Sequence, residues 1–212
     1  IKSSLPVIKD TNLKSIALIT PKGVLGTIVE GELTKAQTEI GFNLKLIENI
    51  KQGDTDFRAL ITKVKALGVD GVFIASLPDE GYRLIKQLRE LKFEGKILAE
   101  VDFDENILKD YGIIAEGIYL PGHISPIFDE SFTQTYKAKY NENPDLYVAL
   151  GHSIGITLIN ALKNGSFSKE KLIGQKDTKT AIIGFEFRSD RTISVPVESL
   201  VFKEGRIQRL SK

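Results

Sequence analysis

The 212-residue sequence contains no cysteine, no methionine and no tryptophan, and it has only two histidines. Without cysteine, the chain can form no disulfide, no cysteine-based zinc site and no thiol nucleophile, and either a reducing or an oxidising compartment suits it. Two histidines are too few for a histidine-rich metal centre. We therefore expect no metal site. Since the chain also starts at Ile1, the lack of methionine favours a processed or trimmed chain.

The sequence also lacks an excess of either charge, because 29 Lys and Arg residues balance 28 Asp and Glu residues to a net charge of +1. This balance excludes the basic footprint of a nucleic-acid-binding protein. No uninterrupted apolar run approaches the roughly 18 residues of a membrane span, so no transmembrane segment is expected. With 42% hydrophobic residues, the chain has the composition of a globular protein of one large or two small domains.

The first half of the chain alternates between short apolar runs and stretches with helical periodicity. Strands are predicted at residues 15–20 (SIALIT), 43–48 (NLKLIE), 71–75 (GVFIA) and 96–99. Three helices are predicted between or after them: one after the turn at 21–23, one from about Asp56 to a C-cap at Gly68, and one from Pro78 to Leu91. Because strands and helices alternate, the sequence predicts an α/β fold with a doubly wound, mainly parallel sheet over residues 15–121. No phosphate-binding loop and no dinucleotide fingerprint occurs, so no cofactor is expected.

The pattern changes after Pro121. Helices are predicted at residues 130–140 and 144–163, the second capped by Asn143 with Pro144 in its first turn. Short strands are predicted at 182–187, 192–202 and 206–210, with a hairpin turn at Glu204 and Gly205. The chain therefore combines one complete α/β half with a smaller, mainly helical part.

Several separated segments resemble one family, the type I periplasmic solute-binding proteins of ABC transporters, in the branch that binds branched-chain amino acids and amides. They are residues 16–26 (IALITPKGVLG), 53–57 (GDTDF), 64–75 (VKALGVDGVFIA), 115–119 (AEGIY), 132–150 (FTQTYKAKYNENPDLYVAL) and 199–210 (SLVFKEGRIQRL). The resemblance implies a two-lobed clamp. Residues 1–14 would be an interlobe linker, 15–121 the second lobe, 122–180 helices of the first lobe, and 181–212 a crossing strand with a hairpin. The first part of the N-terminal lobe has no counterpart here.

The resemblance also implies a function. A small amino-acid-like or polar solute would bind between the lobes, and lobe closure would present the complex to a membrane permease. The hinges would be residues 4–6, 116–122 and 180–187. We expect a non-enzymatic monomer, either periplasmic or tethered outside the membrane.

Candidate binding residues lie mostly where parallel strands end, because ligands of open α/β sheets bind at that edge. The resemblance places Leu25 and Leu77 where the family has aromatic residues, beside Gly26 and Ser76, and it offers Glu100 or Asp102 for an ammonium group. The alternative for the acids is a solvated turn that caps the next helix. His152 and Ser153 stand where the family often has an aromatic and an acidic residue. The predicted ligand-binding residues are Leu25, Gly26, Ser76, Leu77, Glu100, Asp102, His152 and Ser153.

Two other functions were weighed. Residues 151–155 (GHSIG) match the nucleophile elbow of α/β-hydrolases, but no histidine follows His152 to act as the general base. The preferred interpretation is a continuous helix, in which Gly151 and Gly155 let another backbone approach closely. A ligand-sensing regulatory domain of the same fold is the second alternative. Asp56 and Phe57 are interpreted as structural, one at a helix start and one in the core.

Overall fold

The computed structural model describes residues 4–101, 105–121, 128–163, 168–173, 175, 179–190, 192–195 and 198–210. The chain divides into two compact units. Unit 1 comprises Ile1–Ile124 and Glu198–Lys212, and unit 2 comprises Ser125–Val197. Each unit has its own hydrophobic cluster and is described separately.

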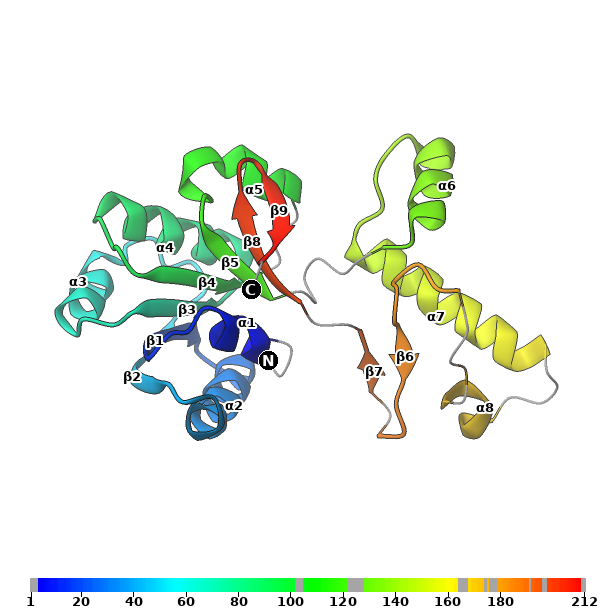
Figure 1. Ribbon diagram of the computed structural model, residues 1–212. Helices are drawn as coiled ribbons and strands as arrows, with labels where there is room; N and C mark the ends of the chain where they lie inside the picture. Colours follow the sequence, from blue (N-terminus) through cyan, green and yellow to red (C-terminus); the bar gives the residue numbers. More distant parts are fainter. Residues whose placement is uncertain are drawn as a thin grey trace. The chain divides into compact units, whose positions relative to one another are not determined.

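Unit 1 is built on a seven-stranded sheet in the order β2-β1-β3-β4-β5-β8-β9 (Figure 1). Its strands are β1 (Ser15–Pro21), β2 (Asn43–Ile50), β3 (Gly71–Ala75), β4 (Lys96–Glu100), β5 (Ile118–Pro121), β8 (Ser199–Lys203) and β9 (Arg206–Arg209). The first five strands pair in parallel, and β8 and β9 add antiparallel. The predicted doubly wound, mainly parallel α/β sheet is confirmed.

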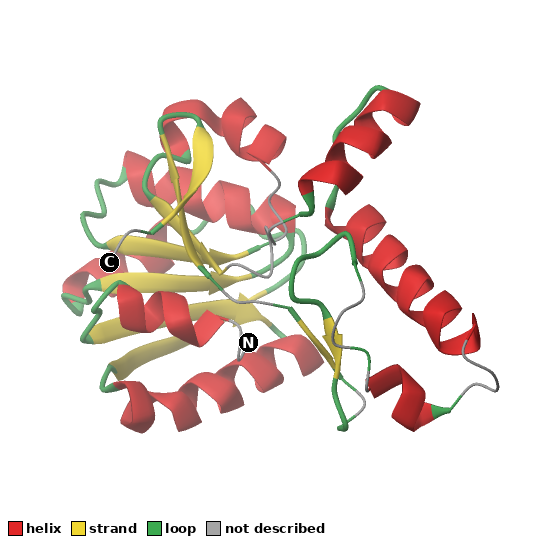
Figure 2. Ribbon diagram, turned by 45° about the vertical axis from the view of Figure 1, so that its right-hand side comes forward, coloured by secondary structure: helices red, strands yellow, loops and turns green. Residues whose placement is uncertain are grey.

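Helices cover both faces of this sheet (Figure 2). They are α1 (Leu5–Asp10), α2 (Val24–Ile40), α3 (Arg58–Ala66), α4 (Pro78–Glu90), α5 (Glu105–Tyr111) and the short 3-10 helix η2 (Gly112–Ile114). Alternate residues of β1 face opposite layers, as the two-residue repeat of a strand requires. Ile16 and Leu18 join the cluster of α1 and α2, whereas Ala17 and Ile19 join the cluster of α3 and α4. Burial on both faces explains the continuous apolar runs in the sequence.

Several helix ends of unit 1 form as the sequence predicts. Pro78 is the first residue of α4, where its missing N–H costs no hydrogen bond, and Gly68 follows α3 with a φ of +55°. Helix α3 begins at Arg58 rather than near Asp56, because Phe57 turns into the core with 3% of its surface exposed. The hairpin turn is confirmed: Lys203 pairs with Arg206 across Glu204 and Gly205, which both have positive φ.

Unit 2 is mainly helical. Its elements are α6 (Glu130–Tyr140), α7 (Leu146–Lys163), α8 (Lys169–Ile173), β6 (Glu186–Phe187) and β7 (Ile193–Ser194). The N-terminal cap of α7 is Asp145, whose Oδ1 accepts the N–H of Val148 at 2.8 Å, and not Asn143 as predicted. The strands predicted at residues 182–187 and 192–202 are also wrong in their bounds. The first shrinks to β6 because Gly184 adopts a φ of +76°, and the second divides into β7 of unit 2 and β8 of unit 1.

Helix α7 exposes much of its apolar surface. Its buried positions are the small residues Ala149, Ser153, Thr157 and Ala161, while Ile159 and Leu162 are 48% and 57% exposed. By length and composition α7 could cross a membrane, although the sequence contains no uninterrupted apolar run of that length. Core helices pass the same test, and one face of α7 packs against the cluster of Ala181, Ile182 and Phe185. The helix therefore has one packed face and one open apolar face.

The linker, crossing strand and hairpin that the resemblance implies can be compared with the two units. Residues 5–10 of the expected linker form α1, whose Val7 and Ile8 are buried in unit 1. Residues 181–197 cluster with unit 2, and the hairpin of β8 and β9 belongs to unit 1. The chain thus passes between the units after residues 124 and 197. The roles of 1–14 as a linker and of 180–187 as a hinge stay predictions.

Candidate functional site

The candidate site lies at the C-terminal edge of the sheet in unit 1. Because β1, β2, β3 and β4 are parallel, their last residues share one edge: Pro21 pairs with Ile50, and Ala75 pairs with Glu100. The loops after these strands therefore start side by side. Their position is the one that the sequence predicts for a ligand-binding edge.

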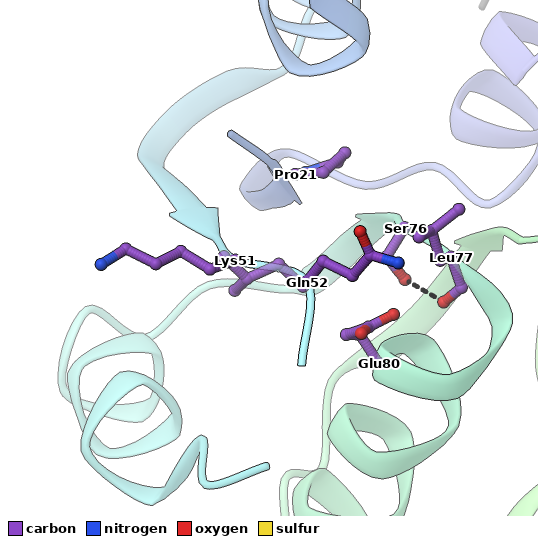
Figure 3. Close-up of a pocket in the computed structure, with 7 residues that line it drawn as sticks. Pro21, Lys51, Gln52, Ser76, Leu77 and Glu80 are labelled. Atoms are coloured by element: carbon purple, nitrogen blue, oxygen red, sulfur yellow. Dashed lines mark hydrogen bonds between the residues drawn. The ribbon is translucent and has the colours of Figure 1, made fainter. Parts of the chain in front are cut away.

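A small pocket opens between three of these strand ends (Figure 3). Its volume is about 200 Å³, including the open mouth. It is lined by Pro21, Ile50, Lys51, Gln52, Ser76, Leu77 and Glu80. Two of the predicted binding residues, Ser76 and Leu77, belong to this lining. The Ser76 hydroxyl donates to the carbonyl oxygen of Leu77 at 3.1 Å, and the Leu77 side chain is 45% exposed.

Glu80 gives the pocket a buried negative charge. The residue is 5% exposed, and its Oε1 accepts the backbone N–H of Gly53 at 2.8 Å. Its place in the first turn of α4 also stabilises the carboxylate through the helix dipole. The other charged lining residue, Lys51, extends away from the rest of the lining (Figure 3). The lining therefore combines one buried carboxylate with mainly apolar surface.

Sequence reasoning missed Glu80 and Gln52. Glu80 follows Pro78 and Asp79 at a predicted helix start, where an acidic residue is common and needs no further explanation. Its burial depends on a contact with Gly53, 27 positions earlier in the chain. Gln52 lies in a polar loop with no pattern of its own. Only the order of the strands in the sheet could have brought these two residues together.

Three other predicted residues of unit 1, Leu25, Gly26 and Glu100, do not line the pocket. Leu25 is 50% exposed in the first turn of α2, and Gly26 is buried against the backbone of Pro21. Glu100 ends β4, and its Oε2 accepts the hydroxyl hydrogen of the buried Ser4 at 2.8 Å. Asp102 lies outside the described residues. The ligand-binding roles of these residues stay predictions.

His152 and Ser153 belong to unit 2, in the middle of α7. The His152 ring is exposed and lies 4.6 Å, centroid to centroid, from the ring of Phe132. Ser153 is fully buried, and its Oγ accepts the backbone N–H of Ile182 at 3.1 Å. Since the whole GHSIG segment is helical, Ser153 is not on the sharp strand-to-helix turn that a hydrolase nucleophile occupies. The hydroxyl has a structural partner instead.

Gly151 and Gly155 of α7 were expected to let another backbone approach closely. An added β-carbon at either glycine would meet no described atom within 4 Å, so this close approach does not occur in the described chain.

Among the described residues, no cluster of three or more histidine, aspartate or glutamate side chains could hold a metal ion. The chemistry that the site offers is therefore binding through hydrogen bonds, one carboxylate and apolar contacts.

Comparison with known proteins identifies the family. The family model described as periplasmic binding protein matches residues 5–192. The leucine-, isoleucine-, valine-, threonine- and alanine-binding protein of Pseudomonas aeruginosa is 23% identical over 189 residues, which are 84% of this chain and 50% of that protein. The chain thus spans about half the length of this relative.

Solved structures show the same fold. The substrate-binding protein LivJ of the branched-chain amino acid transporter of Streptococcus pneumoniae, in complex with isoleucine, has a TM-score of 0.77 at 21% identity, covering 96% of this chain and 62% of LivJ. A solute-binding protein of an ABC transporter from R. palustris, in complex with benzoate, has a TM-score of 0.77 at 16% identity, covering 99% of this chain and 61% of the other. From the family match over residues 5–192, we conclude that this chain belongs to the periplasmic binding protein family.

Proposed function

We propose that the chain is part of the extracytoplasmic solute-binding component of an ABC importer and binds an amino-acid-like or other small polar solute. The observation that carries this proposal is the pocket of Ser76, Leu77 and Glu80 at the C-terminal edge of the sheet, in a chain of the periplasmic binding protein family. The relatives that support it are named as binding proteins for leucine, isoleucine, valine, threonine and alanine. A membrane permease and a periplasmic or tethered location belong to the same proposal.

The character of the pocket narrows the class of solute. The buried Glu80 carboxylate supports a solute that brings a protonated amine or another donor, because a buried charge is stabilised by an opposite charge and by hydrogen bonds. The exposed Leu77 offers an apolar contact beside it. A free amino acid with a small or aliphatic side chain has both features, whereas an anion without an amine lacks the first.

Solute binding would act through a shift between conformations. The chain passes from one unit to the other after residues 124 and 197. A change in the relative orientation of the two units would require the backbone to change conformation at these two positions. A solute that binds one orientation more tightly shifts the population toward it by the difference in affinity. We propose no chemical step, since the named relatives are binding proteins.

Calorimetric titration of the full-length protein tests the proposal. We expect alanine, threonine, valine, leucine or isoleucine to bind and to raise the melting temperature, and benzoate to bind more weakly than the best amino acid because it carries no donor for Glu80. If none of the amino acids binds, the proposal of an amino-acid solute is wrong. Tighter binding of benzoate would overturn the proposed role of the buried carboxylate.

A pair of matched variants locates the site. Leu77 and Leu67 are both exposed leucines of unit 1, 45% and 38% exposed, but only Leu77 lines the pocket. We expect Leu77→Asp to weaken binding by roughly tenfold or more, because it adds a second negative charge and removes an apolar contact. Leu67→Asp should leave the affinity unchanged. Equal effects of the two substitutions would place the site elsewhere.

A further inference from the structure

Helix α4 holds the loop after β2 through two of its side chains. Glu80 Oε1 accepts the N–H of Gly53 at 2.8 Å, and Gln87 Oε1 accepts the N–H of Phe57 at 2.7 Å. The amide nitrogen of Gln87 also donates to the carbonyl oxygen of Thr55 at 2.7 Å. Residues seven apart lie on the same side of a helix after two turns, so both side chains reach the same loop. The segment of residues 51–57 is thus attached to α4 at Gly53, Thr55 and Phe57.

The held segment forms one side of the pocket. Lys51 and Gln52 belong to the lining, whereas Gln87 does not. The segment forms no helix or strand. Two hydrogen bonds between Asp54 and Lys51 close its turn: the Asp54 carboxylate accepts the N–H of Lys51, and the Asp54 N–H donates to the carbonyl oxygen of Lys51. Those bonds shape the turn but do not attach it to the sheet or to α4. Attachment to α4 comes from Glu80 and Gln87.

We infer that Gln87, together with Glu80, is a positioning residue that keeps residues 51–57 in place as a preformed side of the binding pocket. The inference rests on the proposed function, because it assigns Gln87 an effect on solute affinity without contact with the solute. A site that is already ordered before binding loses less conformational entropy on binding, and it therefore binds more tightly than a loose one. The hydrogen bonds of Gln87 supply this order from outside the pocket.

Hydrogen exchange in the full-length protein without solute tests the holding role. We expect Gln87→Leu to accelerate exchange of the Phe57 amide by about tenfold or more, because its acceptor is removed while the side chain keeps a similar size. Lys86→Leu is the control, since Lys86 is the exposed neighbour of Gln87 on the same helix. Glu80→Gln keeps an acceptor for Gly53 and should preserve protection there, whereas Glu80→Leu should remove it. Unchanged exchange of Phe57 in Gln87→Leu would overturn the inference.

Isoleucine titration then tests the effect on affinity. We expect Gln87→Leu to weaken isoleucine binding by roughly threefold to tenfold, and Lys86→Leu to leave it unchanged. Gln87→Glu keeps the acceptor for Phe57 but loses the donor to Thr55, so it should restore protection at Phe57 and part of the affinity. If Gln87→Leu does not fold, Gln87→Glu provides the test in its place.

Failure of the inference and failure of the proposed function would give different experimental results. If exchange rises and affinity does not fall, Gln87 has a structural role only and the inference is wrong. If neither isoleucine nor another amino acid binds the unchanged protein, the proposed amino-acid solute is wrong, and with it the effect of Gln87 on affinity for that solute, while the exchange data still decide whether Gln87 holds the segment.

Discussion

Gly26 lies so close to Pro21 that a β-carbon on the glycine would stand 2.0 Å from the carbonyl oxygen of the proline. No side chain fits at this distance, because real β-carbons are essentially never found within 3.0 Å of a backbone atom. The first turn of α2 therefore packs directly on the end of β1. Pro21 also lines the pocket, so this contact positions one side of the candidate site.

Gly26→Ala is expected to destabilise the protein by roughly 1–3 kcal/mol, because the backbone of Pro21 or the start of α2 must move. The free energy of unfolding in urea measures the effect. Gly31→Ala in the same helix is the control, since an added β-carbon there meets no described atom within 4 Å. It should stabilise the protein by about 0.5–1 kcal/mol through the better helix propensity of alanine. If both substitutions stabilise, the close contact at Gly26 is wrong.

Ser153→Ala is expected to destabilise unit 2 by about 1–3 kcal/mol. The substitution leaves the buried N–H of Ile182 without the acceptor that now lies 3.1 Å away. Exchange of the Ile182 amide measures the effect locally and should accelerate in the variant. Ser131→Ala, at an exposed position of α6, serves as the control and should leave this amide unchanged. Equal exchange of Ile182 in both variants would show that the hydroxyl has no structural role.

The fold of unit 1 could be predicted because its signals are local. The apolar run of β3 is buried on both faces, and Pro78 starts α4 at the position that tolerates proline, so pattern and structure agree there. The alternation of strands and helices predicted a mainly parallel sheet, but it did not predict the order of the strands in that sheet. Helix α7 was predicted as a continuous helix, but its buried face does not follow its apolar residues: Leu162 is 57% exposed, whereas Ser153 and Thr157 are buried.

The candidate site was predicted only in part, since its parts come from separate loops. Ser76 and Leu77 follow a strand directly, and the rule for ligands at strand ends finds them. Glu80 and Gln87 act on residues about 30 positions away, through Gly53 and Phe57. A helix pattern shows that such polar residues exist, but it does not show which loop they reach. That information arises from the pairing of β1 with both β2 and β3.

Gly155→Ala tests whether the open face of α7 is free. In the described chain an added β-carbon meets nothing within 4 Å, so the substitution should stabilise the 212-residue chain by about 0.5–1 kcal/mol. The shift of the unfolding midpoint measures it. A destabilisation instead would show that residues outside the described ranges, or a second molecule, pack closely on this glycine.

The last prediction concerns acid stability and Asp70. Its Oδ2 accepts the backbone N–H groups of Lys14 and Ser15 at 3.0 and 2.8 Å and so connects the start of β1 to the start of β3. Hydrogen bonding with the Ser15 side chain, and with these two N–H groups, lowers the pKa of Asp70. A carboxyl whose pKa is lower in the folded state stabilises the fold above its unfolded pKa of about 3.9. That contribution is lost as the pH falls through the lowered value.

We therefore expect Asp70→Asn to lower the free energy of unfolding at pH 7, by no more than about 1 kcal/mol because the side chain is exposed to solvent. The same variant should lose less stability than the unchanged protein between pH 5 and pH 2, since the titrating group is gone. Urea unfolding at several pH values measures both effects. Asp110→Asn, at an exposed position of α5, is the control and should retain the original slope. A pH dependence that is the same in Asp70→Asn and in the unchanged protein would show that the pKa of Asp70 is the same in the folded and the unfolded chain, and would contradict the prediction.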